Sequence, residues 1–238
     1  MRKLEAFSKA GYLILPGNSQ WIVPNSIINL SKLEKAWNCG NPINYISRSN
    51  LSRHYLEFGT FWGRSFYTNF FKFSDWLKGD FFAFDSFSGL SQPLEIEEKY
   101  SAYDFQKGNY NCNKKTFEAI GTLLKCDFSR IKVIPGYFSE SLKNTNQLLK
   151  SLKPHSVSVC YIYCDLLEPT LEVLTFVEDL LEPGALIYFD DWRLCRASSL
   201  AGERGAAIEW LNKNHKFELI EFDRTNWQSQ WFIFQNNC

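Results

Sequence analysis

The sequence has no excess of charge of either sign and no long apolar segment. Lysine and arginine together number 26, as do aspartate and glutamate, so no overall field would attract nucleic acid or an anionic membrane. No stretch approaches the roughly 20 apolar residues that a membrane-spanning helix needs, and Arg2 and Lys3 precede only the short apolar run 12–15. We therefore expect a soluble, cytoplasmic protein without a signal peptide, and neither nucleic acid nor a membrane as its partner.

Paired cysteines and clustered histidines are also lacking. The seven cysteines form no C-x-x-C pair, and a chain of 238 residues is large enough to fold without disulfides, so we expect reduced thiols. The three histidines are scattered, with His54 and His155 at the entrances of predicted strands and His215 after a predicted helix. Residues that enter a parallel strand lie at the edge opposite the ligand site, so we assign no catalytic histidine.

What the sequence does contain is an alternation of short apolar runs with helical patterns. Helical spacing appears at 66–77 and at 170–181, and Pro169 opens the second of these helices while Gly184 closes it. This alternation predicts βαβ units and a mainly parallel sheet. The runs that predict its buried strands are 55–58, 81–84, 131–134, 157–163 and 185–189.

The end of the chain breaks this rhythm. Residues 217–222 and 230–234 are strand-like runs joined by a polar turn, with no room for a crossover helix, so they must form an antiparallel hairpin. We expect an α/β fold with a doubly wound, seven-stranded, mainly parallel sheet that ends in this hairpin. That is a Rossmann-like methyltransferase arrangement, whereas nicotinamide-binding folds usually continue with parallel strands.

Two segments do not follow the alternation. Residues 1–50 carry several prolines among aromatic, Asn and Ser residues, and we expect a partly helical lid or a homodimerisation arm there. The remaining residues, 51–238, would form one domain. Residues 91–113 form a long irregular segment beside the predicted cleft, and such segments are usually functional or disordered. We expect one or both segments to order when ligands bind.

The run YLEFGTFWGRS at residues 55–65 predicts a buried strand, a glycine turn and a helix start, which is where an open α/β sheet holds a nucleotide-like cofactor. Gly59 and Gly63 let the backbone approach a ligand closely. Glu57 places a carboxylate at the strand end, where it would repel a pyrophosphate but suits a cationic ligand. The spacing G-x-x-x-G also differs from the dinucleotide pattern. We therefore expect S-adenosylmethionine rather than a nicotinamide cofactor.

Acidic residues follow three further predicted strands. Asp85 lies twenty-odd residues beyond the glycine turn, where an acidic side chain accepts hydrogen bonds from ribose hydroxyls, although a loop aspartate that caps a helix is the alternative. Asp165 lies just past the fourth strand, and Asp190 and Asp191 lie past the fifth. Because carboxyl ends of parallel strands meet at one edge of a sheet, we expect these groups to converge.

The last three aspartates suit one of two chemical roles. Their carboxylate oxygens would hold Mg²⁺ and leave positions open for a substrate diol. Alternatively, Asp165 or Asp190 would act as a general base that removes the proton of a hydroxyl group. The structural alternative is that Asp191 caps the following segment and Asp190 accepts backbone donors.

Seven segments, which together span most of residues 55–211, carry a resemblance to a known family: EFGTFWGRS, FFAFDSFSGL, KGNYNC, VIPGYFSESL, CDLLEPTLEVL, GALIYFDDW and GERGAAIEWL. In order and spacing they resemble the class I S-adenosylmethionine-dependent O-methyltransferases of the macrocin and sugar O-methyltransferase type. Members commonly methylate a hydroxyl of a deoxysugar. The resemblance implies three groups of cofactor contacts: the methionine part against Glu57, Gly59, Thr60, Gly63 and Ser65, the ribose against Asp85 and Ser86, and the adenine against Gly136, Tyr137 and Phe138.

One position departs from this family. Related proteins often show D-x-D-L-Y where this chain has YCDLL at residues 163–167, so Tyr163 stands in place of the first aspartate. Strand alternation places Tyr163 and Asp165 on one face. The departure would weaken metal binding, allow a metal-free mechanism or change the acceptor. Tyr163 itself would be a hydrogen-bond donor, a weak base or a packed core residue.

The segment after the fifth strand is rich in charge. Arg193, Arg196 and Arg204 would suit the diphosphate of a nucleotide sugar, although solvated loop charges are the alternative. We expect an enzyme that methylates a hydroxyl of a sugar or sugar-containing small molecule, with a sugar or nucleotide sugar as acceptor and Mg²⁺ as an aid. The alternatives are a methyltransferase for another small-molecule hydroxyl and a catalytically silent cofactor-binding protein.

Overall fold

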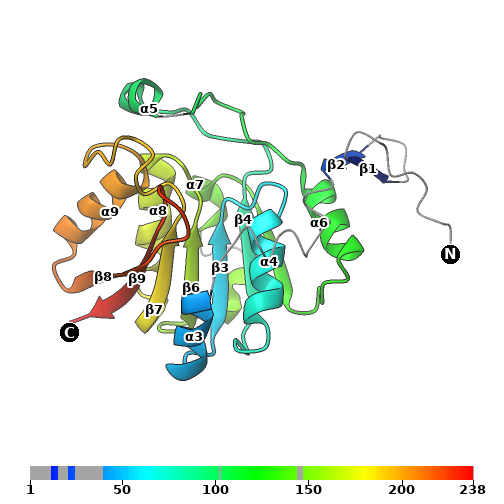
Figure 1. Cartoon of the computed structure of the whole chain (residues 1–238), viewed down its shortest axis with the longest axis horizontal. Coiled ribbons are helices and arrows are strands. Elements are labelled where there is room, and N and C mark those ends of the chain that lie inside the picture. Colours follow the sequence, from blue (N-terminus) through cyan, green and yellow to red (C-terminus); the bar gives the residue numbers. More distant parts are fainter. Residues whose placement is uncertain (1–11, 16–20, 25–39, 102, 144–146, 238) are drawn as a thin grey trace.

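The computed structural model of the chain describes residues 12–15, 21–24, 40–101, 103–143 and 147–237 (Figure 1). Seven strands form one sheet in the order β5-β4-β3-β6-β7-β9-β8, and β1 and β2 form a separate antiparallel pair. The strands are β1 Tyr12–Leu15, β2 Trp21–Pro24, β3 His54–Phe58, β4 Phe81–Asp85, β5 Ile131–Pro135, β6 Val157–Ile162, β7 Leu181–Phe189, β8 Phe217–Asp223 and β9 Gln230–Asn236.

The pairing of these strands confirms the predicted doubly wound sheet. β3 is parallel to β4 and β6, and parallel pairing continues to β5 on one side and β7 on the other. β9 is antiparallel to both β7 and β8, as the predicted C-terminal hairpin requires. The chain winds outward from β3 to β5 and then returns to β6 on the other side of β3. A topological switch point, where open α/β sheets bind ligands, therefore lies between β3 and β6.

Helices cover both faces of the sheet (Figure 1). One hydrophobic cluster joins α3, α4 and α6 to the sheet, and a second joins α8 and α9 to the opposite face. The helices are α3 Gly40–Arg48, α4 Arg64–Phe73, α5 Glu95–Tyr100, α6 Lys114–Leu123, α7 Phe138–Ser141, the 3₁₀ helix η1 Gln147–Ser151, α8 Leu167–Val177 and α9 Gly202–Lys213.

Strand β3 shows how one sequence run supplies both clusters. Tyr55 packs with the α4 side, whereas Leu56 and Phe58 pack with the α8 side, because successive side chains of a strand point to opposite faces. The rings of Phe58 and Phe84, on neighbouring strands, stack with their centroids 4.4 Å apart. A strand covered on both faces has a nearly continuous apolar sequence, and for this reason β3 could be predicted.

The end of α8 differs from the prediction. The helix ends at Val177 and β7 begins at Leu181, so Gly184 lies inside a strand and does not close the helix. Its φ of +90° belongs to the left-handed region that favours glycine. The register between β6 and β7 shifts in this region, since Val157 pairs with Leu181 but Val159 pairs with Leu186, and Gly184 lies in the stretch between these pairs.

Helix α3 is attached to the sheet domain. Its Ile46 is buried in the cluster on the α4 side, and the Tyr45 hydroxyl donates a hydrogen bond to the carbonyl oxygen of Gly184 at 3.0 Å. Asn41 donates from Nδ2 to Oδ2 of Asp223 at 2.9 Å. Most of residues 1–39 lies outside the described residues, so the lid or dimerisation role of the N-terminal segment stays a prediction.

Candidate active site

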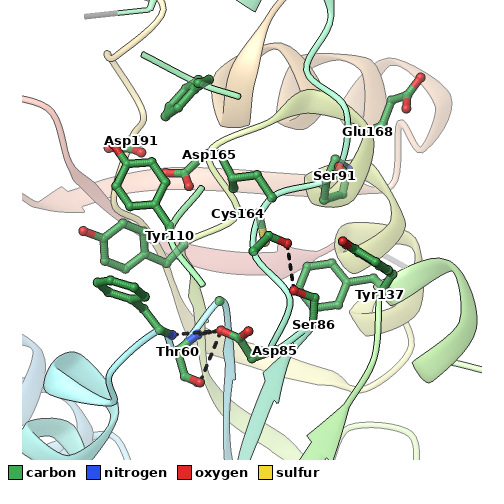
Figure 2. Close-up of a pocket in the computed structure, with 18 of the residues that line it drawn as sticks. Thr60, Asp85, Ser86, Ser91, Tyr110, Tyr137, Cys164, Asp165, Glu168 and Asp191 are labelled. Carbon is green, nitrogen blue, oxygen red and sulfur yellow. Dashed lines mark hydrogen bonds between the residues drawn. The ribbon is translucent and has the colours of Figure 1, made fainter. Parts of the chain in front are cut away.

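A cavity of about 670 Å³ opens at the carboxyl ends of β3, β4 and β6 (Figure 2). It lies at the topological switch point, and its volume falls within the roughly 300 to 1,000 Å³ typical of small-molecule sites. Of the residues predicted to bind a cofactor, seven line this cavity: Gly59, Thr60, Ser65, Asp85, Ser86, Tyr137 and Phe138. The structure therefore brings together residues from three separate strand ends.

The glycine turn after β3 is imposed by packing as well as by ligand access. Gly59 has a φ of +83°, and a Cβ there would lie 1.9 Å from the carbonyl oxygen of Tyr163. Gly63 has a φ of +77°, and a Cβ there would lie 2.4 Å from the Tyr67 ring. Gly59 lines the cavity, whereas Gly63 lies against that ring. Both positions need glycine before any ligand is considered.

Asp85 organises the same turn from the end of β4. Its Oδ2 accepts hydrogen bonds from the backbone N–H groups of Thr60 and Phe61, both at 2.8 Å, and its Oδ1 accepts from the N–H of Phe87 at 2.7 Å. Burial raises the pKa of Asp85, and these backbone donors act in the opposite direction. The Thr60 hydroxyl also donates to Oδ2, at 3.5 Å, so Oδ1, which accepts from Phe87 alone, is the oxygen with capacity for a further donor from the cavity.

Glu57 lies behind the cavity wall and is fully buried. Ser65 donates a hydrogen bond from Oγ to Oε1 of Glu57 at 2.5 Å, and the hydroxyl of Tyr55 donates to Oε2. Burial raises the pKa of Glu57 to about 8. Because Ser65 itself lines the cavity, Glu57 reaches a ligand through this hydroxyl.

A further part of the cavity wall is formed by the residues that follow β4 and β5. Ser86 and Tyr137 lie side by side there (Figure 2). Ser86 donates from Oγ to the carbonyl oxygen of Gly89 at 2.8 Å. Gly136 does not line the cavity, and its N–H donates to the backbone carbonyl of Asp85 at 2.9 Å. Gly136 thus ties the two strand ends together.

Asp165 and Asp191 face each other in the cavity wall (Figure 2). Asp191 is buried and Asp165 is half-buried, and the two carboxyl groups lie within hydrogen-bond reach of one another. Burial is the main cause that raises the pKa of Asp165 to about 7 and raises that of Asp191 as well. Gln228 donates from Nε2 to Oδ1 of Asp191 at 2.7 Å. We call Asp165 and Asp191 the carboxyl pair.

Asp190 does not line the cavity. Its Oδ1 accepts a hydrogen bond from the Tyr188 hydroxyl at 2.6 Å, and the side chain of Tyr163 also hydrogen-bonds to it. Tyr163, which departs from the family pattern, lines the cavity and so lies between Asp190 and a ligand. Burial and the neighbouring aspartates raise the pKa of the Tyr163 hydroxyl, which therefore stays protonated and donates.

The predicted magnesium ligands form only part of a metal site. Within the ranges that the structure describes, no group of three or more His, Cys, Asp or Glu side chains is placed to hold a metal ion. Asp190 is engaged by tyrosines, whereas Asp165 and Asp191 share the cavity wall. Two carboxylates with water and substrate oxygens are the ligand set that Mg²⁺ commonly takes. Of the three predicted ligands, Asp165 and Asp191 are therefore the two that a cation in the cavity could use.

Glu203 is a site residue that sequence reasoning missed. It is fully buried, its Oε1 accepts from the N–H of Cys164 at 3.1 Å, and its Oε2 accepts from the N–H of Asp191 at 2.8 Å. One side chain of α9 thus joins the segments that carry Asp165 and Asp191. The segment GERGAAIEWL carries part of the family resemblance, but nothing in its sequence indicated that Glu203 would contact the backbone of Cys164 and Asp191.

The irregular segment 91–113 contributes to the cavity. Tyr103, Phe105 and Tyr110 line it, together with Ser91 at the segment's start. The short helix α5 lies within this segment, above the carboxyl ends of the strands (Figure 1). Its Glu97 is buried, as described below, and anchors the segment. The predicted location beside the cleft is therefore confirmed.

The arginines after β7 point away from the cavity. Arg193 donates from Nη1 to the carbonyl oxygen of Ser229 at 2.8 Å and from Nη2 to Oε1 of Gln230 at 2.7 Å. Arg204 donates to the carbonyl oxygen of Ala197 at 2.6 Å. Neither they nor Arg196 line the cavity, so the structure does not form the predicted fork there.

Comparisons with known proteins give structural matches alone. No family model matches the sequence, and no curated protein matches it. The O-methyltransferase NovP matches with a TM-score of 0.64 at 16% identity, over 88% of this chain and 81% of that chain. The calicheamicin methyltransferase CalS11 matches with a TM-score of 0.63 at 19% identity, over 85% of this chain and 79% of that chain. A cofactor-bound structure of Rv0187 from MTB matches at 0.51, with 13% identity over 90% and 91% of the two chains.

These matches and the strand order show that the chain has the Rossmann-like methyltransferase fold. The C-terminal hairpin, predicted from the spacing of the last two strands, belongs to this arrangement. In the part of the chain that is described, no helix has the length and apolar character needed to cross a membrane.

Proposed function

We propose that this protein transfers the methyl group of S-adenosylmethionine to a hydroxyl of a sugar or sugar-containing small molecule. The observation that carries the proposal is one cavity with the glycine turn and Asp85 in one part of its wall and the carboxyl pair in another (Figure 2). A cofactor and an acceptor that share the cavity would meet between them. The similarity to NovP and CalS11 supports the proposal, since CalS11 is described as a TDP-rhamnose 3'-O-methyltransferase.

The cofactor would lie along the ends of β3, β4 and β5. Oδ1 of Asp85 suits a ribose hydroxyl, because it accepts only from the N–H of Phe87 while Oδ2 holds the glycine turn. Tyr137 and Phe138 offer ring surfaces to the adenine. The remaining predicted contacts that line the cavity would be to the methionine part: Gly59, Thr60 and Ser65, with Glu57 acting through Ser65 and Gly63 shaping the turn from behind.

S-adenosylmethionine, when bound, supplies a methyl group on a positively charged sulfur and leaves as S-adenosylhomocysteine. The chain's own task is to hold the acceptor oxygen in line with that methyl group and to take the hydroxyl proton. Positioning of this kind supplies about 7 to 11 kcal/mol, and a placed base adds about 10² to 10⁴-fold in rate. We assign proton removal to the carboxyl pair, with Asp190 fixing the Tyr163 side chain in the cavity wall through a hydrogen bond to its hydroxyl.

A divalent cation such as Mg²⁺ would be held by Asp165 and Asp191, where it would lower the pKa of an acceptor hydroxyl. Chelation with EDTA distinguishes this role from a metal-free base, since chelation abolishes turnover only if the cation is needed. Tyr163→Asp sharpens the comparison. A carboxylate beside the pair is expected to tighten Mg²⁺ binding if the site uses the cation.

Calorimetry with S-adenosylmethionine, S-adenosylhomocysteine and NAD tests the proposed cofactor. We expect the first two to bind and NAD not to bind at the same concentrations, because the glycine spacing differs from the dinucleotide pattern and the acidic side chains that line the cavity disfavour a pyrophosphate. Binding of NAD alone would contradict the proposal. A pool of glycosides is then incubated with the protein and S-adenosylmethionine. Mass spectrometry detects a methylated glycoside by its added mass of about 14 Da, because a methyl group replaces a hydrogen.

The observation that favours a second function is Tyr163 itself. Tyr163 departs from the family pattern in the part of the cavity that holds the carboxyl pair, whereas the glycine turn and Asp85 are intact. A cofactor-binding protein without catalytic activity would show this combination. Cofactor binding without methylation of any pooled hydroxyl compound would favour this second function.

A further inference from the structure

Three residues in the cavity wall hold their backbones in the left-handed region without being glycine. Phe61 has a φ of +46°, Tyr110 of +57° and Asp165 of +63°. For a bulky aromatic residue this conformation is a genuine outlier, and such strain gathers where a site needs a particular side-chain direction. Asp165 belongs to the carboxyl pair, and Tyr110 lies beside that pair (Figure 2). Asp165 and Tyr110 therefore lie in the acceptor region, and Phe61 contacts Tyr110 from the glycine turn.

The two aromatic rings are presented to the cavity with much of their surface uncovered. Phe61 is 39% exposed and Tyr110 is 44% exposed. Their ring centroids lie 6.1 Å apart and the rings meet edge to face at 80°. Phe61 is held in place through its N–H, which donates to Asp85. The rings thus form a fixed apolar corner next to the carboxyl pair, which we call the aromatic corner.

The charge of the cavity wall opposes a phosphorylated acceptor. Arg64 is the only basic residue among the described residues that line the cavity. The arginines after β7 that a diphosphate would need are bound elsewhere, Arg193 most completely. The acidic residues in the wall outnumber this one arginine, and they are Asp85, Asp165, Glu168, Glu172 and Asp191. A diphosphate would meet repulsion there with little compensation.

We propose that the acceptor is an uncharged, phosphate-free sugar ring, presented as a glycoside, that rests its C–H face on the aromatic corner formed by Phe61 and Tyr110. This inference rests on the proposed function and adds the substrate class. A sugar ring has one apolar face and several hydroxyls at its edge, which matches an apolar corner beside a pair of hydrogen-bonding carboxyl groups. Phe61 and Tyr110 are then specificity-determining residues, and a nucleotide sugar is not the substrate.

Equilibrium binding in the presence of S-adenosylhomocysteine tests this proposal. The ligands are 4-nitrophenyl glycosides of several hexoses and deoxyhexoses, the nucleoside-diphosphate derivatives of the same sugars, and 4-nitrophenol. We expect at least one glycoside to bind about ten-fold more tightly than its nucleotide counterpart and than 4-nitrophenol. Tighter binding of the nucleotide sugar overturns the proposal. Equal binding of 4-nitrophenol, or no binding of any glycoside, also overturns it.

Glycine variants test the two rings without disturbing the left-handed backbone. Phe61→Gly and Tyr110→Gly are each expected to weaken glycoside binding about ten-fold, and in Tyr110→Gly, which lies outside the glycine turn, the affinity for S-adenosylhomocysteine stays within about two-fold. Phe71→Ala is the matched control, because Phe71 is also 39% exposed and does not line the cavity. Unchanged glycoside affinity in both glycine variants contradicts the proposal. If the unmodified protein does not bind S-adenosylhomocysteine at all, that result contradicts the proposed function instead.

Discussion

Glu203 accepts a hydrogen bond at Oε2 from the backbone N–H of Asp191 at 2.8 Å, while its Oε1 accepts from the N–H of Cys164. The side chain is fully buried and so fixes the spacing of the two segments that carry the carboxyl pair. Because Glu203 itself does not line the cavity, it acts by positioning these two segments and not by contacting a ligand.

Glu203→Gln is therefore expected to lower kcat by about 10 to 100-fold, the range seen when a residue that orients an active group is changed. An amide cannot accept at both of its terminal atoms, so one of the two backbone contacts is lost. The affinity for S-adenosylhomocysteine should stay unchanged, as calorimetry can show. Glu209→Gln is the control, because Glu209 lies on the same helix and pairs with Lys213 at the surface. Equal kcat in the two variants would refute the positioning role.

Asp85→Asn tests the cofactor end of the cavity. We expect the affinity for S-adenosylhomocysteine to fall by about 1 to 3 kcal/mol, because charge-assisted hydrogen bonds to the turn and the ribose are weakened. Calorimetry measures the change, and Asp75→Asn, at an exposed position, serves as the control. An affinity equal to that of the unmodified protein would remove Asp85 from the ribose site.

The raised pKa of Glu57 predicts that the free energy of unfolding depends on pH. Its folded-state pKa of about 8 exceeds the ordinary 4.5, so the folded protein binds this proton more tightly than the unfolded chain does. Its stabilising contribution is fully present below about pH 4.5 and is lost as the pH rises to about 8. The loss in the free energy of unfolding is on the order of 3 to 5 kcal/mol, since each unit of difference in pKa is worth about 1.4 kcal/mol.

Urea unfolding measures this contribution when the unmodified protein and Glu57→Gln are compared at about pH 5.5, 7 and 8.5. The comparison isolates Glu57 because the other buried carboxyl groups are common to both proteins. The unmodified protein should lose stability relative to the variant as the pH rises. A constant difference between the two across this range would show that Glu57 does not titrate in it.

The segment 91–113 is expected to become more protected from hydrogen exchange when S-adenosylhomocysteine and an acceptor bind together. Its anchor is Glu97, whose Oε1 accepts from the N–H groups of Leu167 at 2.6 Å and Gly202 at 3.1 Å. Glu97→Gln should raise exchange in the segment, whereas Glu98→Gln, at an exposed neighbouring position, should not. Equally fast exchange with and without both ligands would count against a closing lid.

The sequence predicted the sheet and its switch point because these depend on periodic patterns. Alternating apolar runs located β3 to β7, and the short turn before β9 required the hairpin. The convergence of Asp85, Asp165 and Asp191 followed from parallel topology alone, since carboxyl ends of parallel strands share one edge.

Contacts between side chains far apart in the sequence could not be predicted in this way. Glu203 meets Cys164 across 39 positions, and its bond depends on how α9 packs. Arg193 was a candidate for a diphosphate but binds the β9 segment, which lies 36 positions further along the chain. The error at Gly184 had a local cause, because proline and glycine mark either a helix end or an irregular strand.

The turnover of Asp165→Asn tests the central claim most directly. S-adenosylhomocysteine formation would be measured with the glycoside pool for the unmodified protein and the variant, each with and without EDTA. If the carboxyl pair activates the acceptor, as a base or as cation ligands, the variant loses about 10² to 10⁴-fold in kcat while its calorimetric affinity for S-adenosylhomocysteine stays the same. Full activity of Asp165→Asn in EDTA would contradict the account.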